Sequence, residues 1–164
     1  MDKGKSIDLL NRAVADELQA VHQYMYWHFH LDDQGFGPLS ALLKRIAIAE
    51  MGHIETLADR ILFLKGDVEM VSAGPVEKVT DAEAIVARAG QMEQEAVAVY
   101  NDFSLKCAAN ADNGTKQIFE QLVNDEEAHF DEFDKQLDNI KRFGPSYLAL
   151  QSFSASPSAG EAAQ

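Results

Sequence analysis

The sequence has a single cysteine, Cys107, among its 164 residues. An internal disulfide needs two cysteines, and four-cysteine zinc or rubredoxin-type iron sites need four, so all of these are excluded. No apolar run approaches the roughly 20 residues of a membrane-spanning helix. Residues 1–5 lead into an amphipathic pattern with no apolar signal-peptide core. We therefore expect a cytoplasmic protein that has no membrane partner.

Helix-breaking residues and basic residues are also scarce. Ten glycines and four prolines fall mostly in a few short stretches, which leaves the chain between them free to be helical. Only 14 lysines and arginines oppose 27 acidic residues, giving a formal net charge of −13. A nucleic-acid partner would need a basic face, so we expect none. The acidic balance fits a protein that attracts cations, and it equally fits a protein kept soluble by its charge.

Four long segments carry the apolar periodicity of helices. Their apolar stripes advance in steps of three and four residues, as in the seam of a bundle helix. The stripes run from Leu10 to Leu31, from Leu39 to Leu64, from Val86 to Cys107 and from Phe119 to Ile140. The length suits one domain, which we place at residues 1–153, with a disordered tail over the Ser/Ala/Gly-rich residues 154–164.

Turn and cap residues divide these segments. The first two helices are separated at Gly35 and Gly37-Pro38, and a capping box of Thr80 and Glu83 opens the third. Asp112-Asn113-Gly114 forms a turn before the fourth helix, and Gly144-Pro145 ends it. Residues 146–153 then form a short fifth helix. The link from Gly66 to Val79 is much longer than the other connections. When extended it spans about 45 Å, enough to cross a bundle of helices about 42 Å long. The expected fold is therefore an all-α, ferritin-like four-helix bundle with one long crossover.

Acidic and imidazole groups occupy places on the apolar stripes where core residues belong. They are Glu17, Glu50, Glu93 and Glu126, with His53 and His129 one turn beyond two of them. A buried carboxylate is costly unless it is paired or bound to metal. Any one of these glutamates could instead lie on a solvated edge, but that explanation fails for the whole set.

The set repeats within the chain. Glu17 precedes Glu50 by 33 residues, Glu93 precedes Glu126 by 33 residues, and both second members open a Glu-x-x-His motif. A Glu and a His three residues apart share a helix face, so both reach one ion. Four carboxylates and two imidazoles, without thiolates, predict a pair of iron or manganese ions.

Other polar residues on the first and third stripes allow more than one interpretation. Tyr24 and Tyr100 each follow a stripe glutamate by seven residues, and either could hydrogen-bond a ligand carboxylate, donate electrons or simply fill the core. His28 is too far from Glu17 to share its ion, so we expect a hydrogen-bonded histidine there. Cys107 is expected to be a small core residue.

These residues and their spacings resemble the bacterioferritins. Segments such as Ala20-Val-His-Gln-Tyr24 and Arg60-Ile-Leu-Phe-Leu64 add to the likeness, which covers about residues 5–153. The resemblance implies a ferroxidase centre with two iron ions per subunit. Glu50 and Glu126 would bridge the irons, Glu17 and Glu93 would be terminal ligands, and His53 and His129 would each bind one ion.

The resemblance also implies features beyond the iron pair. Met51 stands where the family places an axial ligand of haem, with one haem per pair of subunits. The family further implies a homo-oligomeric shell of 24 subunits that stores iron mineral, Fe(II) with dioxygen or peroxide as substrates, and a ferredoxin-like reductant. Arg45 and Ala49 depart from the His and Asp with which some members form an inner-surface iron site.

Three other functions remain open at this point. A rubrerythrin-like di-iron peroxide reductase would have to act without its rubredoxin module, because only Cys107 is present. A DNA-protecting mini-ferritin is disfavoured by the acidic charge and by a different ligand pattern. A structural bundle whose metals only stabilise the fold would consume no oxygen on addition of Fe(II).

Overall fold

The computed structural model describes residues 1–153, and the tail expected to be disordered lies outside them. The described chain contains only helices, which are α1 Lys3–Asp33, α2 Gly37–Phe63, α3 Ala82–Ala109, α4 Asn113–Phe143 and α5 Pro145–Phe153. The predicted all-α fold class and the short fifth helix are therefore confirmed. None of these helices combines the length and the apolar character that a membrane span requires.

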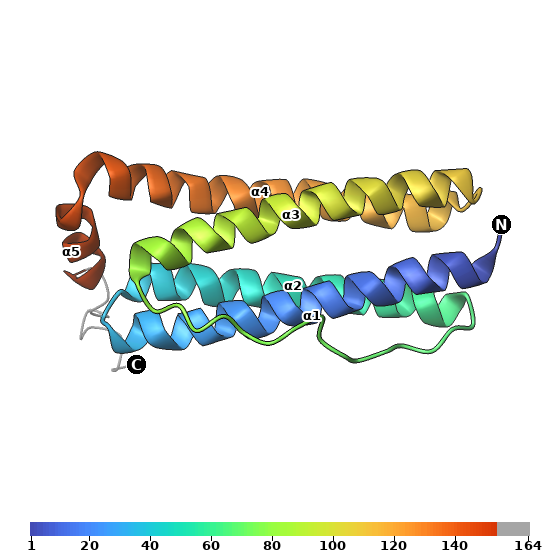
Figure 1. Cartoon of the computed structure of the whole chain (residues 1–164), viewed down its shortest axis with the longest axis horizontal. Coiled ribbons are helices and arrows are strands. Elements are labelled where there is room, and N and C mark those ends of the chain that lie inside the picture. Colours follow the sequence, from blue (N-terminus) through green and yellow to red (C-terminus); the bar gives the residue numbers. More distant parts are fainter. Residues whose placement is uncertain (154–164) are drawn as a thin grey trace, which may run out of the picture.

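The helices form two antiparallel hairpins that lie side by side. α1 packs on α2, and α3 packs on α4. The segment between α2 and α3 runs along the bundle beside α1 from one end to the other, while α5 turns across the end where α4 finishes (Figure 1). This is the predicted long crossover, and it makes α2 and α3 parallel.

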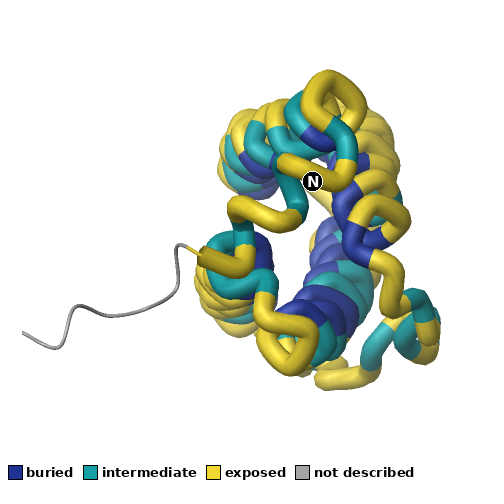
Figure 2. The backbone as a smooth tube through the Cα atoms, turned by 90° about the vertical axis from the view of Figure 1, so that its left-hand side faces the viewer, coloured by how far each residue is buried: buried dark blue, intermediate teal, exposed yellow. Residues whose placement is uncertain are grey.

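The core consists of two apolar clusters, one toward each end of the bundle. The first surrounds Trp27 and Phe133, and the second surrounds Phe103 and Phe119. Seen along the bundle, the buried residues face the space between the four helices and the exposed ones face outward (Figure 2). The stripe residues between the two clusters are polar, so the middle of the bundle is its least apolar part.

Two buried side-chain amides of α1 hold the crossover in place. Asn11 donates from Nδ2 to the carbonyl of Asp67 (3.0 Å) and accepts at Oδ1 from the backbone N–H of Glu69 (2.9 Å). Gln23 donates to the carbonyl of Glu77 (3.1 Å) and accepts from the backbone N–H of the same residue (2.6 Å). Each amide satisfies backbone groups that would otherwise be unpaired against the helix, so the crossover is fixed at both points.

The predicted capping box at Thr80 is wrong by one residue. Asp81 is the N-cap of α3, in extended backbone conformation, and its carboxylate accepts from the backbone N–H of Ala84 at 2.9 Å. Ala82 then begins the helix with its side chain in the core, which fixes the register. Asp112 likewise caps α4, so Asn113 and Gly114 belong to the helix and the turn lies before them.

Asp112 also ties α4 to α2. Its carboxylate accepts from Nη2 of Arg60 (2.6 Å) and from Oγ1 of Thr115 (2.6 Å). Burial alone would raise the pKa of Asp112, but hydrogen bonds from Thr115, Ser6 and Arg60 outweigh it and lower the pKa to about 2.

We expect Asp112→Asn to lower the free energy of unfolding by about 3 kcal/mol at pH 7, because it leaves the half-buried Arg60 without its counter-charge. The folded pKa lies below the unfolded value of about 3.9, so this stabilisation is present above about pH 4 and is lost toward pH 2. Denaturant unfolding followed by circular dichroism should show the two proteins converging as pH falls. A difference that stays constant with pH would contradict the assignment.

Candidate metal centre

The middle of each long helix contributes one glutamate to a buried polar cluster. Glu17, Glu50, Glu93 and Glu126 have exposed fractions of only 1–2%, and the accompanying His53 and His129 are also buried. The cluster lies between the two hairpins. All six residues predicted from the sequence are brought together.

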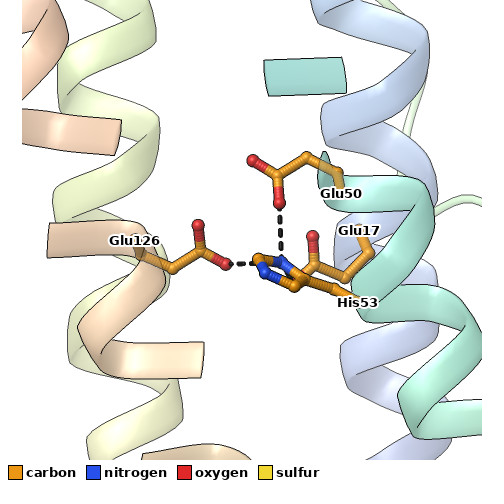
Figure 3. Close-up of side chains that lie close together, drawn as sticks. All are labelled: Glu17, Glu50, His53 and Glu126. Carbon is orange, nitrogen blue, oxygen red and sulfur yellow. Dashed lines mark ion pairs between the residues drawn. The ribbon is translucent and has the colours of Figure 1, made fainter. Parts of the chain in front are cut away.

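Their donor atoms form two overlapping groups. In one group, ligand atoms of Glu17, Glu50, His53 and Glu126 lie within 4.8 Å of one another, and in the other those of Glu50, Glu93, Glu126 and His129 do so. Figure 3 shows the first group, with Glu126 of α4 approaching His53 from the opposite hairpin. Glu50 and Glu126 belong to both groups, which places one carboxylate from each hairpin between two candidate cation positions.

Both imidazoles turn Nδ1 toward the carboxylates. Nδ1 of His53 lies 2.7 Å from Oε2 of Glu50, 3.3 Å from Oε1 of Glu126 and 3.5 Å from Oε1 of Glu17. Nδ1 of His129 lies 3.0 Å from Oε1 of Glu50 and 3.0 Å from Oε2 of Glu126. The one N–H that Nδ1 of each ring can carry cannot donate to several carboxylate oxygens at once.

The hydrogen bonding within the cluster is incomplete, which tests whether cations fit. Both carboxylate oxygens of Glu50 and Nδ1 of His53 are buried without a hydrogen-bond partner, because their short contacts are badly aligned for hydrogen bonds. Buried polar atoms without partners are rare and call for an explanation. Oxygen and imidazole lone pairs that converge on two points suit two divalent cations of the iron or manganese kind.

The electrostatics of the cluster couple metal binding to proton release. Burial alone would lower the pKa of His129, but its hydrogen bond to Glu126 and the negative charge of the nearby Glu50 raise it to about 10, and the pKa of His53 is raised as well. Burial raises the pKa of Glu17 and of Glu93, and neighbouring carboxylates add to that effect. A cation at Nδ1 needs neutral imidazoles and charged carboxylates, so its binding displaces protons.

Two tyrosines hold the outer glutamates, each across the interface between hairpins. The hydroxyl of Tyr100 on α3 donates to Oε1 of Glu17 on α1 at 2.6 Å, and that of Tyr24 on α1 donates to Oε1 of Glu93 on α3. Burial raises the pKa of both tyrosines, which keeps them neutral donors. The structure thus confirms hydrogen bonding to these carboxylates, while electron donation stays a prediction.

The remaining candidates behave differently. His28 contacts Oγ of Ser40 at 2.7 Å and takes no part in the cluster, as expected. Cys107 is buried in the core, where burial raises the pKa of its thiol to about 11. The sequence reasoning missed Asp125, whose Oδ2 lies 3.5 Å from Nε2 of His53. Its only sequence signal was its position beside Glu126.

Met51 lies outside the cluster. It follows Glu50 on α2, yet 46% of Met51 is exposed whereas Glu50 is buried. A step of one residue turns about 100° around a helix, so Met51 faces out of the bundle. Arg45, on the same helix, forms an ion pair with Glu132 of α4.

A cavity of about 250 Å³ leads from the surface between α1 and α3 to the cluster. Glu17, Tyr24, Glu93 and Tyr100 line it, and Arg12 and Arg88 are among its other lining residues. A small molecule therefore has access to the side of the cluster that the two tyrosines occupy.

Comparisons with known proteins agree with this arrangement. The ferritin-like domain family matches residues 7–143. A bacterioferritin from Desulfovibrio desulfuricans is 37% identical over 147 residues, covering 90% of this chain and 82% of the relative. One from Rhodobacter capsulatus is 33% identical, covering 89% and 91%.

Two solved bacterioferritin structures share the fold. The D. desulfuricans structure, described with a diiron site in different catalytic states, has a TM-score of 0.89 at 35% identity, covering 96% of this chain and 95% of that one. The R. capsulatus structure, described with a metal-free dinuclear site and haem iron, has a TM-score of 0.88 at 31% identity, covering 97% and 98%. By sequence and by structure, this chain belongs to the bacterioferritin family of ferritin-like proteins.

Proposed function

We propose that the chain is the ferroxidase subunit of an iron-storage protein. Two Fe(II) ions bind in the buried cluster, with Glu50 and Glu126 shared between them. Glu17 and His53 complete one position, and Glu93 and His129 complete the other. The observation that carries this proposal is the membership of both Glu50 and Glu126 in the two ligand groups.

The reaction follows from the charges and electrons available. Four carboxylates balance the four positive charges of two Fe(II) ions, so the pair enters a buried site without a large net charge. Each ion gives up one electron on oxidation to Fe(III). Together with two protons, the two electrons reduce dioxygen to hydrogen peroxide, or reduce hydrogen peroxide to two molecules of water. Tyr24 and Tyr100 hold the outer carboxylates in place throughout.

Anaerobic protein mixed with Fe(II) and then with dioxygen or peroxide tests the proposal. We expect a rapid rise in Fe(III) absorbance that saturates at two iron ions per chain, with matching oxidant consumption, followed by slower deposition of mineral. Iron binding without rapid oxidation would indicate a metal that only stabilises the bundle. Catalytic removal of peroxide without stored iron would indicate a peroxide reductase.

We also propose a homo-oligomeric shell of 24 subunits in the cytoplasm, with haem between pairs of subunits and a ferredoxin-like reductant for iron release. The support is family membership together with the outward-facing thioether of Met51. The haem iron named for the R. capsulatus relative points the same way.

Sedimentation velocity at physiological salt should therefore show one large species. Its expected mass is about 430 kDa, which is 24 times 18.1 kDa. Closed symmetry predicts a single sedimentation boundary, and the mass derived from it should not grow with protein concentration. A monomer or a simple dimer under these conditions would contradict the shell.

A further inference from the structure

The two imidazoles of the cluster differ on their outward side. Nε2 of His53 lies 3.5 Å from Oδ2 of Asp125, and Oδ1 of Asp125 accepts from Nε2 of Gln121 at 2.9 Å. A chain of contacts therefore runs from Gln121 through Asp125 to Nε2 of His53, whose other ring nitrogen, Nδ1, faces into the cluster. Asp125 itself is half-buried on α4 and reaches a histidine of the opposite hairpin.

His129 lacks such a partner. Its ion-pair and hydrogen-bond contacts within residues 1–153 all involve Nδ1, directed at Glu50, Glu93 and Glu126. The internal repeat gives a reason for this. The residue before Glu126 is Asp125, whereas the residue before Glu50 is Ala49, which has no polar side-chain atom.

A carboxylate behind a metal-binding imidazole changes the ligand. A histidine that binds through Nδ1 carries its proton on Nε2, and a carboxylate that accepts this proton fixes both the tautomer and the ring orientation. It also makes the inner nitrogen a better electron donor. Gln121 restrains Asp125 for this contact, since the amide occupies the other carboxylate oxygen.

We propose that Asp125 is a positioning residue that acts through His53 and makes the Glu17–His53 position the tighter of the two. The asymmetry arises because Asp125 has only Ala49 as its counterpart in the repeat. This inference rests on the proposed function only in requiring that both positions bind a divalent cation. It concerns equilibrium affinity, not the oxidation step.

Co(II) is a suitable probe, because it shares ligand preferences with Fe(II), is stable in air and reports its coordination through visible absorbance. We expect the assembled wild-type protein to bind two Co(II) per chain in two resolved steps. Asp125→Ala should weaken the tighter step by about 10- to 100-fold, the usual cost of removing such an outer partner. Asp125→Asn should recover part of the loss, because an amide oxygen can also accept a proton from Nε2 of a metal-bound His53.

The matched control is Asp138→Asn, which removes one exposed carboxylate from α4 about 20 Å along the helix from Asp125. It should leave both steps unchanged and so exclude a general charge effect. A complementary variant, Ala49→Asp, should tighten the weaker step. It should add no third equivalent, because Arg45 still stands in place of the His of the inner-surface iron site.

Two equivalents with unchanged affinities in Asp125→Ala would overturn the inference. So would a slower rate of Co(II) uptake at unchanged affinity, which would make Asp125 an entry ligand. Unaltered binding in Ala49→Asp would refute the origin of the asymmetry. Wild-type protein that takes up fewer than two Co(II) per chain would defeat the proposed function as well, so the two failures are distinguishable.

Discussion

Replacing Glu126 by alanine is expected to reduce the rate of rapid Fe(II) oxidation by at least about 100-fold while leaving a helical, assembled protein. Glu126 belongs to both ligand groups, so both iron positions lose a ligand in one substitution. Its carboxylate also accepts a hydrogen bond from His129 and lies beside His53. Burial would raise the pKa of Glu126, but these two histidines lower it to about 2, which keeps it charged for metal.

Stopped-flow absorbance after mixing Fe(II) with aerated protein measures this effect. Glu127→Ala is the matched control, because Glu127 is the exposed neighbour on the same helix and carries the same charge. Far-ultraviolet circular dichroism and sedimentation should show intact helices and assembly in both variants. Rapid oxidation at the wild-type rate in Glu126→Ala would remove this residue from the site.

The second large effect concerns haem. We expect Met51→Leu to abolish haem binding, because leucine has the size and hydrophobicity of methionine but offers no lone pair to iron. Met51 is half-exposed beside a buried Glu50, so its thioether projects out of the bundle and away from the cluster. The rate of iron oxidation should change little, since Met51 faces away from the cluster. Haem content per chain, measured after expression with ample haem, gives the result.

Met70→Leu serves as the control for this substitution. Met70 is also exposed, but it lies in the crossover and follows no ligand glutamate. It should retain full haem. Equal haem in wild type and Met51→Leu would disprove the axial role, and an absence of haem in the wild type would reduce Met51 to a residue that packs at an interface.

The six cluster residues could be predicted because their pattern is redundant. Four helices each present a charged residue on an apolar stripe, and the 33-residue spacing occurs twice. Each occurrence alone is weak evidence for a metal site. Four carboxylates buried together, however, need compensating positive charge, and bound cations are one of the few ways to supply it. The fold could be predicted for a similar reason, since short connections force antiparallel neighbours and a long one permits a crossover.

Features that depend on which helices face each other could not be predicted. Tyr24 shares a stripe with Glu17, yet it bonds Glu93 of the other hairpin, and only the docked bundle decides that exchange. From the sequence alone, Asp125 would be interpreted as a solvated neighbour of Glu126, because only the folded structure places His53 opposite it. The sequence gives no sign that Asn11 on α1 holds the crossover. Its hydrogen-bond partners are backbone groups, which residues of any type supply.

The crossover has a consequence for resistance to proteolysis. Its most exposed apolar residues, Met70 and Val71, lie between the two points where Asn11 and Gln23 form hydrogen bonds with the backbone of the segment. Ala73 adds a bond from its N–H to the carbonyl of Ala15 on the far side of the same spot. A protease that cuts between Met70 and Val71 would thus leave each new chain end still fastened to α1. The two hairpins would remain together as a nicked but folded subunit, held by the same side chains that guide the intact chain from one end of the bundle to the other.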